Sequence, residues 1–225
     1  MVSKLIIRTV LWIAAMAVLL FVSAGTLRWP GAWIFLAEVL VLSLAIGLWL
    51  NRHDPGLLRE RMGSFVQRNQ TAGDRIFMIP LISLYVGWLV LMALDAQRFG
   101  WSSVPVWAQA LGALGIFLTM YVCYLTFREN SFAAPVIKIQ AERGHRVVTT
   151  GPYAYVRHPM YAGALLFFVG VPLLLGSWWG LALAPLLTAL LVFRIGVEER
   201  TLRAGLPGYR EYAARVRYRL IPLVW

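Results

Sequence analysis

The chain has 225 residues, of which 60% are hydrophobic and only 14% are charged. Soluble domains average about 25% charged residues, so this composition excludes a disordered chain and argues against an ordinary soluble domain. The net charge of +11 does not indicate nucleic-acid binding, because the basic residues flank apolar stretches instead of forming a soluble basic domain. The single cysteine, Cys123, excludes an internal disulfide, and three widely spaced histidines predict no metal site.

Long apolar stretches predict membrane-spanning helices, since one crossing needs about 20 apolar residues. Four stretches read as one helix each: Thr9–Leu27, Trp29–Leu50, Ile76–Leu94 and Phe99–Phe127.

The fifth stretch, Pro159–Phe193, runs 35 residues without a charge. As one helix it would reach roughly 52 Å, well beyond a hydrocarbon core of about 30 Å. The sequence GSWWG at 176–180 supplies turn residues and interfacial aromatics. We therefore expect a tight hairpin of two short helices, at about 160–175 and 179–196, which need not both cross the bilayer completely.

The expected fold is an all-α, polytopic membrane helix bundle with about six membrane segments. We expect four transmembrane helices within 1–127, with a basic cytosolic loop at 51–75. Residues 128–225 form the expected catalytic region, made of a cytosolic loop, the hairpin at 159–196 and a cytosolic tail beside a cofactor pocket.

The basic residues predict the orientation. With the N-terminus inside, 19 of the 21 lysines and arginines lie on the cytosolic side, and only Arg28 and Arg98 lie outside. This is the asymmetry of the positive-inside rule, so both termini are expected in the cytosol. A cleaved secretory signal ending near VSA at 22–24 is the alternative for the first helix, and it leaves the downstream topology unchanged.

Two features of the N-terminal half have open interpretations. Glu38 is the one acid inside an expected span, where it could bond a neighbouring helix or take part in substrate or proton chemistry. The segment NRHDPGLLRERMG at 51–63 reads as a turn and a short basic helix, for which contact with lipid headgroups is the simplest explanation.

Two clusters near the hairpin could carry chemistry. The sequence GPYAYVRHPMYAG at 151–163 precedes and starts the hairpin, and a helix that begins at Pro159 points free N–H groups at the loop, where an anionic group could bind. Arg194 and Glu198 are four residues apart at the other end, beside Glu199. Because the hairpin helices are antiparallel, both clusters should meet at the cytosolic membrane surface.

These clusters, with the tail GLPGYREYAARVRYRLIP, resemble the isoprenylcysteine carboxyl methyltransferase and phospholipid methyltransferase superfamily of integral-membrane enzymes. The likeness is strong over roughly 128–222 and weaker before it. The loop at 51–63 is similar to the bacterial branch, which implies a multi-pass protein of a bacterial inner membrane.

The resemblance implies S-adenosylmethionine as methyl donor, S-adenosylhomocysteine as product, and a pocket open to the cytosol. The acceptor would be a lipophilic small molecule or lipidated group reached from the bilayer, and no nucleic-acid partner is expected. The residues implied to bind the cofactor are His145, Val147, Val148, Gly151, Tyr153, Arg157, His158, Pro159, Tyr161, Gly163, Glu198 and Glu199.

Arg194 and Glu198 are the expected catalytic residues. If the acceptor is a carboxylate, Arg194 could hold it while Glu198 orients the arginine. If the acceptor is an amine, as in phospholipid N-methylation, Glu198 or His158 would serve as base. Two competing interpretations are an NADPH-dependent sterol-type reductase, which shares part of the RHP string, and a non-enzymatic membrane protein.

Overall fold

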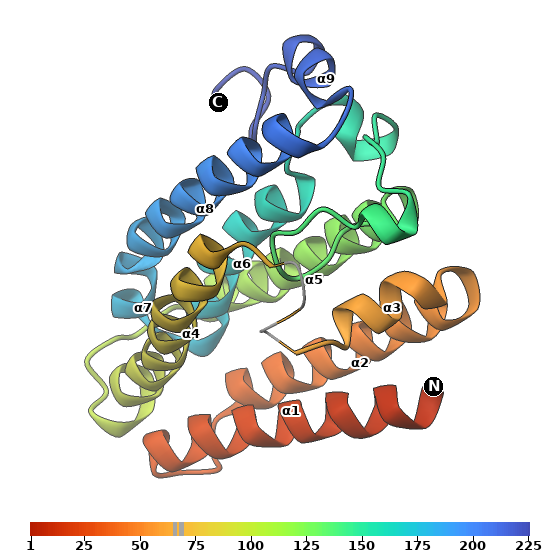
Figure 1. Ribbon diagram of the computed structural model, residues 1–225. Helices are drawn as coiled ribbons and strands as arrows, with labels where there is room; N and C mark the ends of the chain where they lie inside the picture. The colour runs from red at the N-terminus through yellow and green to blue at the C-terminus, as the bar shows by residue number, and fades with distance from the viewer. Residues whose placement is uncertain (65–66, 68–69) are drawn as a thin grey trace.

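The computed structural model describes residues 1–64, 67 and 70–225, and every regular element within them is helical (Figure 1). Five helical segments are long and apolar enough to cross a membrane, and α6 is a shorter apolar helix. This confirms the all-α, polytopic bundle. The apolar elements are α1 (Val2–Ala24), α2 (Pro30–His53), α4 (Ala72–Ala93) with the π-helical turn η1 (Leu94–Arg98), α5 (Val106–Glu129), α6 (Pro159–Leu175), and α7 (Trp178–Ala182) with α8 (Ala184–Gly205).

Several boundaries differ from the predicted ones for local reasons. The first helix ends at Ala24, three residues early, because Gly25 takes a left-handed conformation and donates its N–H to Phe21. The fourth begins at Val106 and not at Phe99, since Pro105 keeps the residue before it out of helical geometry.

The predicted hairpin is confirmed, but its second arm is longer and broken. Gly176 closes α6 in a left-handed conformation, and the Ser177 hydroxyl accepts the Gly180 N–H to start α7. Pro185 lacks an N–H and interrupts the arm between α7 and α8. From there α8 continues to Gly205, beyond the expected end at 196, so that Glu198 and Glu199 stand on a continuous helix.

The core joins the two parts of the chain. One cluster of buried side chains draws on α1, α2, α4, α5, α6 and α8, and includes Phe35, Trp88 and Val171. The Trp88 indole also donates to the Gly180 carbonyl over 2.7 Å. The hairpin is therefore packed into the N-terminal helices and not appended to them.

The segment at 51–63 is tied to the rest of the chain on one side, and Arg52 and Arg59 are exposed, so its contact with lipid headgroups stays a prediction. Asp54 caps α3 (Pro55–Arg61) by accepting the Leu57 N–H over 2.8 Å. Glu60 then pairs with Lys138 at 2.6 Å, which ties α3 to the loop after α5. The Glu38 Oε2 atom is buried and has no hydrogen-bond partner among the described residues, so through this atom it makes none of the expected bonds to a neighbouring helix.

Helices α5 and α6 approach so closely that their backbones touch, as small residues allow in membrane bundles. A Cβ atom on Gly112 would lie 2.5 Å from the Leu174 nitrogen, and one on Gly170 would lie 2.8 Å from the Gly112 carbonyl oxygen. This contact fixes the C-terminal half of α6 against α5, and nearer the start of α6 the Thr119 hydroxyl donates to the Gly163 carbonyl over 2.9 Å.

We expect Gly112→Ala to destabilise the protein by about 1–3 kcal/mol, because the added methyl group forces the two backbones apart. Thermal unfolding in detergent measures the effect. Gly87→Ala on α4 is the matched control, since nothing lies within 4 Å of its Cβ position. Equal melting temperatures for the two variants would contradict the proposed close packing.

Candidate functional site

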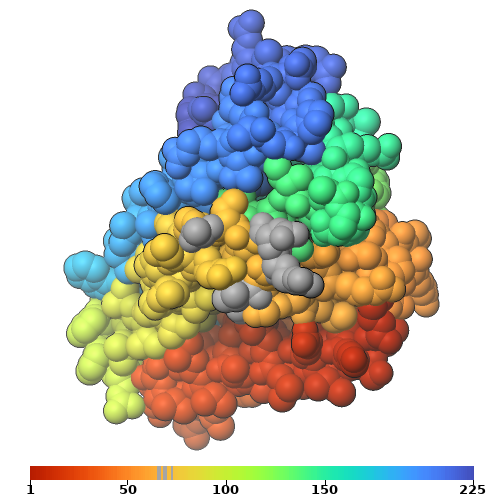
Figure 2. Space-filling model, in the orientation of Figure 1, coloured from red at the N-terminus to blue at the C-terminus, as the bar shows by residue number. Residues whose placement is uncertain are grey.

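A cavity of about 820 Å³, counted out to its open mouth, lies at the end of the bundle where α5 and α8 end and α6 begins. Its wall combines the loop after α5, the first residues of α6, the last turns of α8, and α9 (Tyr209–Arg215). Figure 2 shows this loop, in green, lying against the C-terminal part of the chain, in blue.

The cavity gathers most of the residues that the sequence suggests for the cofactor. They come from residues 145–198 and meet because the hairpin returns α8 beside the start of α6. The predicted residues in the wall are His145, Val147, Val148, Tyr153, Arg157, His158, Pro159, Tyr161 and Glu198.

Four predicted residues lie outside the cavity wall. Gly151, with φ of +58°, packs against the Glu129 side chain, and Gly163 packs against Val122 of α5. Arg194 and Glu199 are held in ion pairs behind the wall. These four residues therefore support the cavity wall from behind and do not line the cavity.

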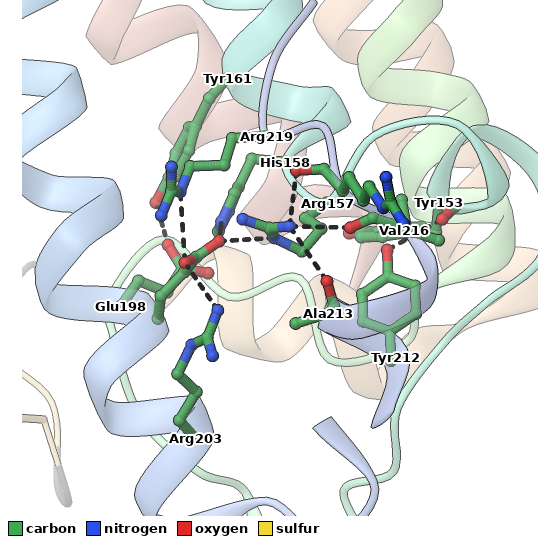
Figure 3. A network of polar contacts seen from close by, with 12 residues as sticks. Tyr153, Arg157, His158, Tyr161, Glu198, Arg203, Tyr212, Ala213, Val216 and Arg219 are labelled. Atoms are coloured by element: carbon green, nitrogen blue, oxygen red, sulfur yellow. Dashed lines mark hydrogen bonds and ion pairs between the residues drawn. The ribbon is translucent and has the colours of Figure 1, made fainter. Parts of the chain in front are cut away.

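Glu199 is the centre of an ion-pair network whose other members, Arg157, His158, Arg203 and Arg219, are labelled in Figure 3. Its carboxylate is buried, and Oε1 lies 2.6 Å from Arg157 Nε and 3.3 Å from His158 Nε2. Oε2 lies 3.3 Å from Arg219 Nε and 3.6 Å from Arg203 Nη2. Both oxygens are thus engaged by the chain's own cations, so Glu199 is poorly placed to bind a further cationic ligand.

Arg157 fastens the C-terminal tail over the site. Its Nη1 atom donates to the carbonyls of Val216 and Arg217 over 2.7 and 2.8 Å. Its backbone N–H donates to Tyr218, and that of His158 donates to Arg219. Since Nε and Nη1 are already used within the protein, these donors of Arg157 are not free to bind a ligand.

Arg194 and Glu198 do not form the expected pair across one turn of α8. Arg194 Nε lies 3.2 Å from the buried Asp74 of α4, and its Nη2 donates to the Pro135 carbonyl over 2.7 Å. Its guanidinium carbon is 5.8 Å from the centre of the Tyr161 ring. The Tyr161 hydroxyl in turn donates to Glu198 Oε2 over 2.6 Å. Arg194 therefore does not line the cavity itself, but it contacts Tyr161, which does.

Two tyrosines of α9 complete the wall. Burial raises the pKa of Tyr212 to about 12 and raises that of Tyr209 as well, so both are protonated donors at neutral pH. Tyr212 donates to the Tyr153 carbonyl over 2.8 Å. The buried Tyr209 hydroxyl has no partner within the described residues, although it faces the cavity.

His145 and Arg146 lie on the loop side of the wall. His145 stacks on Phe132 with ring centres 4.5 Å apart, and its Nδ1 accepts the Gln140 N–H. Burial lowers the pKa of His145 and the nearby Arg143 lowers it further, so the ring is neutral at pH 7. Arg146 is exposed, and no carboxylate lies within 4 Å of its guanidinium in the described ranges.

Sequence reasoning misses Asp74, Arg146, Tyr209 and Tyr212. The strings ERGHRVV and GLPGYREY, which carry the family resemblance, contain three of them and are the available signal. Asp74 has no such signal, because its partner Arg194 is 120 residues away in sequence.

Glu199→Gln is expected to destabilise the C-terminal end by about 3–5 kcal/mol, because it leaves buried guanidinium groups without a counter-charge. The melting temperature in detergent should fall by roughly 10 °C, and limited proteolysis should cut the tail earlier. Glu211→Gln serves as the control, since Glu211 is an exposed carboxylate of the same region. A Glu199→Gln protein as stable as the control would rule out this role.

Parts of this chain are similar to known proteins. Residues 105–206 match the family described as phospholipid methyltransferase. The chain is 37% identical over 83 residues to protein-S-isoprenylcysteine O-methyltransferase B of Arabidopsis thaliana, a match that covers 36% of this chain and 42% of that protein. It is 30% identical over 118 residues to protein-S-isoprenylcysteine O-methyltransferase of Saccharomyces cerevisiae, covering 48% and 46%.

The chain thus spans less than half the length of either relative. The family match nevertheless takes in α5, α6, α7 and α8, which position Glu198, Glu199 and the start of the hairpin. Residues 105–206, which supply much of the cavity wall, are thus similar to the phospholipid methyltransferase family, and parts of the chain are similar to the two isoprenylcysteine methyltransferases.

Proposed function

We propose that this chain is an integral-membrane methyltransferase that uses S-adenosylmethionine to methylate a carboxylate on a lipophilic acceptor of the isoprenylcysteine type. The observation that carries the proposal is the set of unpartnered polar groups around one cavity. Among the described residues, Glu198 Oε1, the Tyr209 hydroxyl and the Arg146 guanidinium face or border the cavity with no partner of their own.

These groups fit the charged parts of S-adenosylmethionine. The free oxygen of Glu198 suits an ammonium, and Arg146 at the open side suits a carboxylate. The Tyr209 hydroxyl can donate to a ligand oxygen, which would satisfy a group that is otherwise buried alone. The rings of Tyr161 and His158, stacked with centres 5.5 Å apart, offer an aromatic face to a sulfonium.

When bound, S-adenosylmethionine would supply an electrophilic methyl group. The work of the chain is then to align the acceptor with the methyl group and to keep water out. A carboxylate acceptor needs no base. An amine acceptor does need one, and here His158 Nε2 faces Glu199 at 3.3 Å, while Glu198 accepts a hydrogen bond from Tyr161 and is assigned above to the ammonium of the cofactor. These engaged groups favour a carboxylate, in line with the O-methylation in the names of the two relatives.

The distribution of charge supports a cytosolic cavity. The Arg98 guanidinium packs against Gly25 at the far end of the bundle, near Arg28, while the cavity lies at the arginine-rich end. On the positive-inside rule we propose that the cavity and both chain ends lie on the cytosolic side of a bacterial inner membrane, within reach of a soluble methyl donor.

The Tyr209→Phe substitution is expected to weaken binding of S-adenosylhomocysteine by about 3- to 10-fold, since one hydrogen bond contributes about 0.5–1.5 kcal/mol. Calorimetric titration of the detergent-purified protein measures this change. Tyr155→Phe on the exposed neighbouring loop should leave the affinity unaltered. Equal affinities of the two variants for S-adenosylhomocysteine would show that the Tyr209 hydroxyl does not bind the ligand.

The proposed activity is tested by incubating the protein with radiolabelled S-adenosylmethionine and N-acetyl-S-farnesylcysteine. We expect a base-labile methyl ester, and loss of transfer in Glu198→Ala. Dimethylphosphatidylethanolamine in place of the acid distinguishes N-methylation. Binding of NADPH with no binding of S-adenosylhomocysteine would contradict the proposal and favour a reductase, and binding of neither by folded protein would favour a non-enzymatic role.

A further inference from the structure

Arg61, the last residue of α3, is a half-buried cation without a counter-ion. Its Nη1 atom donates to the Ala133 carbonyl over 2.9 Å and lies 3.8 Å from the Met160 sulfur. Its guanidinium carbon is 4.2 Å from the centre of the Phe127 ring. In the part of the chain that the structure describes, no carboxylate lies within 4 Å of it.

This lack of a partner sets Arg61 apart from the other buried arginines near the cavity. Arg157 pairs with Glu199 at 2.6 Å, and Arg194 pairs with Asp74 at 3.2 Å. A guanidinium that is taken out of water without a counter-charge loses hydration and gains little in return. Burial accordingly lowers the pKa of Arg61. A bound anion would supply the missing charge.

The position of Arg61 connects it with the cavity. Its two polar contacts, Ala133 and Met160, both line the cavity wall. Arg61 itself does not line the cavity, so it stands directly behind these two residues of the wall. Arg146, by contrast, is an exposed cation in the wall itself.

An apolar groove lies between α2 and α5, with Ala45, Trp49 and Tyr124 in its wall and about 630 Å³ of space counted out to its open side. Trp49 belongs to the same packed cluster as Met160 and Phe127, the neighbours of Arg61. This cluster connects the groove with the cation and, through Met160, with the cavity wall.

From this arrangement we infer that Arg61 binds the carboxylate of the acceptor while its hydrocarbon chain lies in the groove between α2 and α5. The inference rests on the proposed function. It moves the acceptor-binding role from Arg194, which Asp74 already occupies, to an arginine whose charge is free. In the transfer, a carboxylate oxygen forms a bond to the methyl carbon and the carbon–sulfur bond breaks. The electron pair returns to sulfur, and no proton moves.

Equilibrium binding of radiolabelled N-acetyl-S-farnesylcysteine, in the presence of S-adenosylhomocysteine, tests the inference without depending on turnover. We expect Arg61→Gln to weaken binding of this acid by about 10- to 100-fold, as for a charge-assisted hydrogen bond worth about 1.5–3 kcal/mol. Binding of the neutral carboxamide analogue should stay within about 2-fold, and Arg61→Lys should recover part of the loss. Arg59→Gln, on the exposed side of the same helix, is the matched control.

The groove is tested separately by Ala45→Phe, which narrows it and should weaken the acid and the carboxamide alike. Ala14→Phe, at an exposed position on α1, should weaken the binding of neither compound. Unchanged S-adenosylhomocysteine affinity shows that each variant is folded. Equal loss of acid and amide binding in Arg61→Gln, or no loss, would overturn the inference, as would a wild-type protein that does not bind the acid. A wild-type protein that binds the acid selectively through Arg61 but transfers no methyl group would contradict only the proposed function.

Discussion

A single buried carboxylate organises the polar end of this membrane protein. Glu199 draws together the residues before α6, the last turn of α8 and the C-terminal tail, because Arg157, Arg203 and Arg219 all need a counter-charge there. The cavity exists where these elements converge. The cavity wall therefore depends on the charge of Glu199, near the C-terminal end of α8. The other end of α8 packs in the main buried cluster, so this rigid helix fixes the distance from that cluster to Glu199.

The general fold is predictable from the sequence, and the details of pairing are not. Apolar runs and GSWWG locate the hairpin, because helix length and bilayer thickness leave few arrangements. The partner of Arg194 cannot be inferred, since Glu198 is near in sequence while Asp74 is near only after α4 packs on α8. The motif predicts that Glu199 faces a ligand, and only the folded tail shows that its oxygens are occupied. Tyr209 lies in the string GLPGYREY, but the reason to choose it as a ligand-binding residue is its buried, unpartnered hydroxyl in the folded chain.

The division of labour between neighbouring residues follows from burial. Glu198 and Glu199 differ by one position, yet one lines the cavity and the other lies behind it, because successive residues of a helix point about 100° apart. This rotation leaves the Glu199 carboxylate paired within the fold and the Glu198 carboxylate available to a ligand. A family motif of two adjacent acids thus combines two functions that composition alone cannot distinguish.

The groove between α2 and α5 and the cavity at the polar end of the bundle would supply the two reactants of the proposed transfer from two different phases. One reactant would arrive from water and be governed by its concentration there. The other would never leave the bilayer and would be governed by its mole fraction among the surrounding lipids. Diluting that reactant with inert lipid would slow the reaction at constant total amount, so the membrane itself would act as the solvent for half of the chemistry.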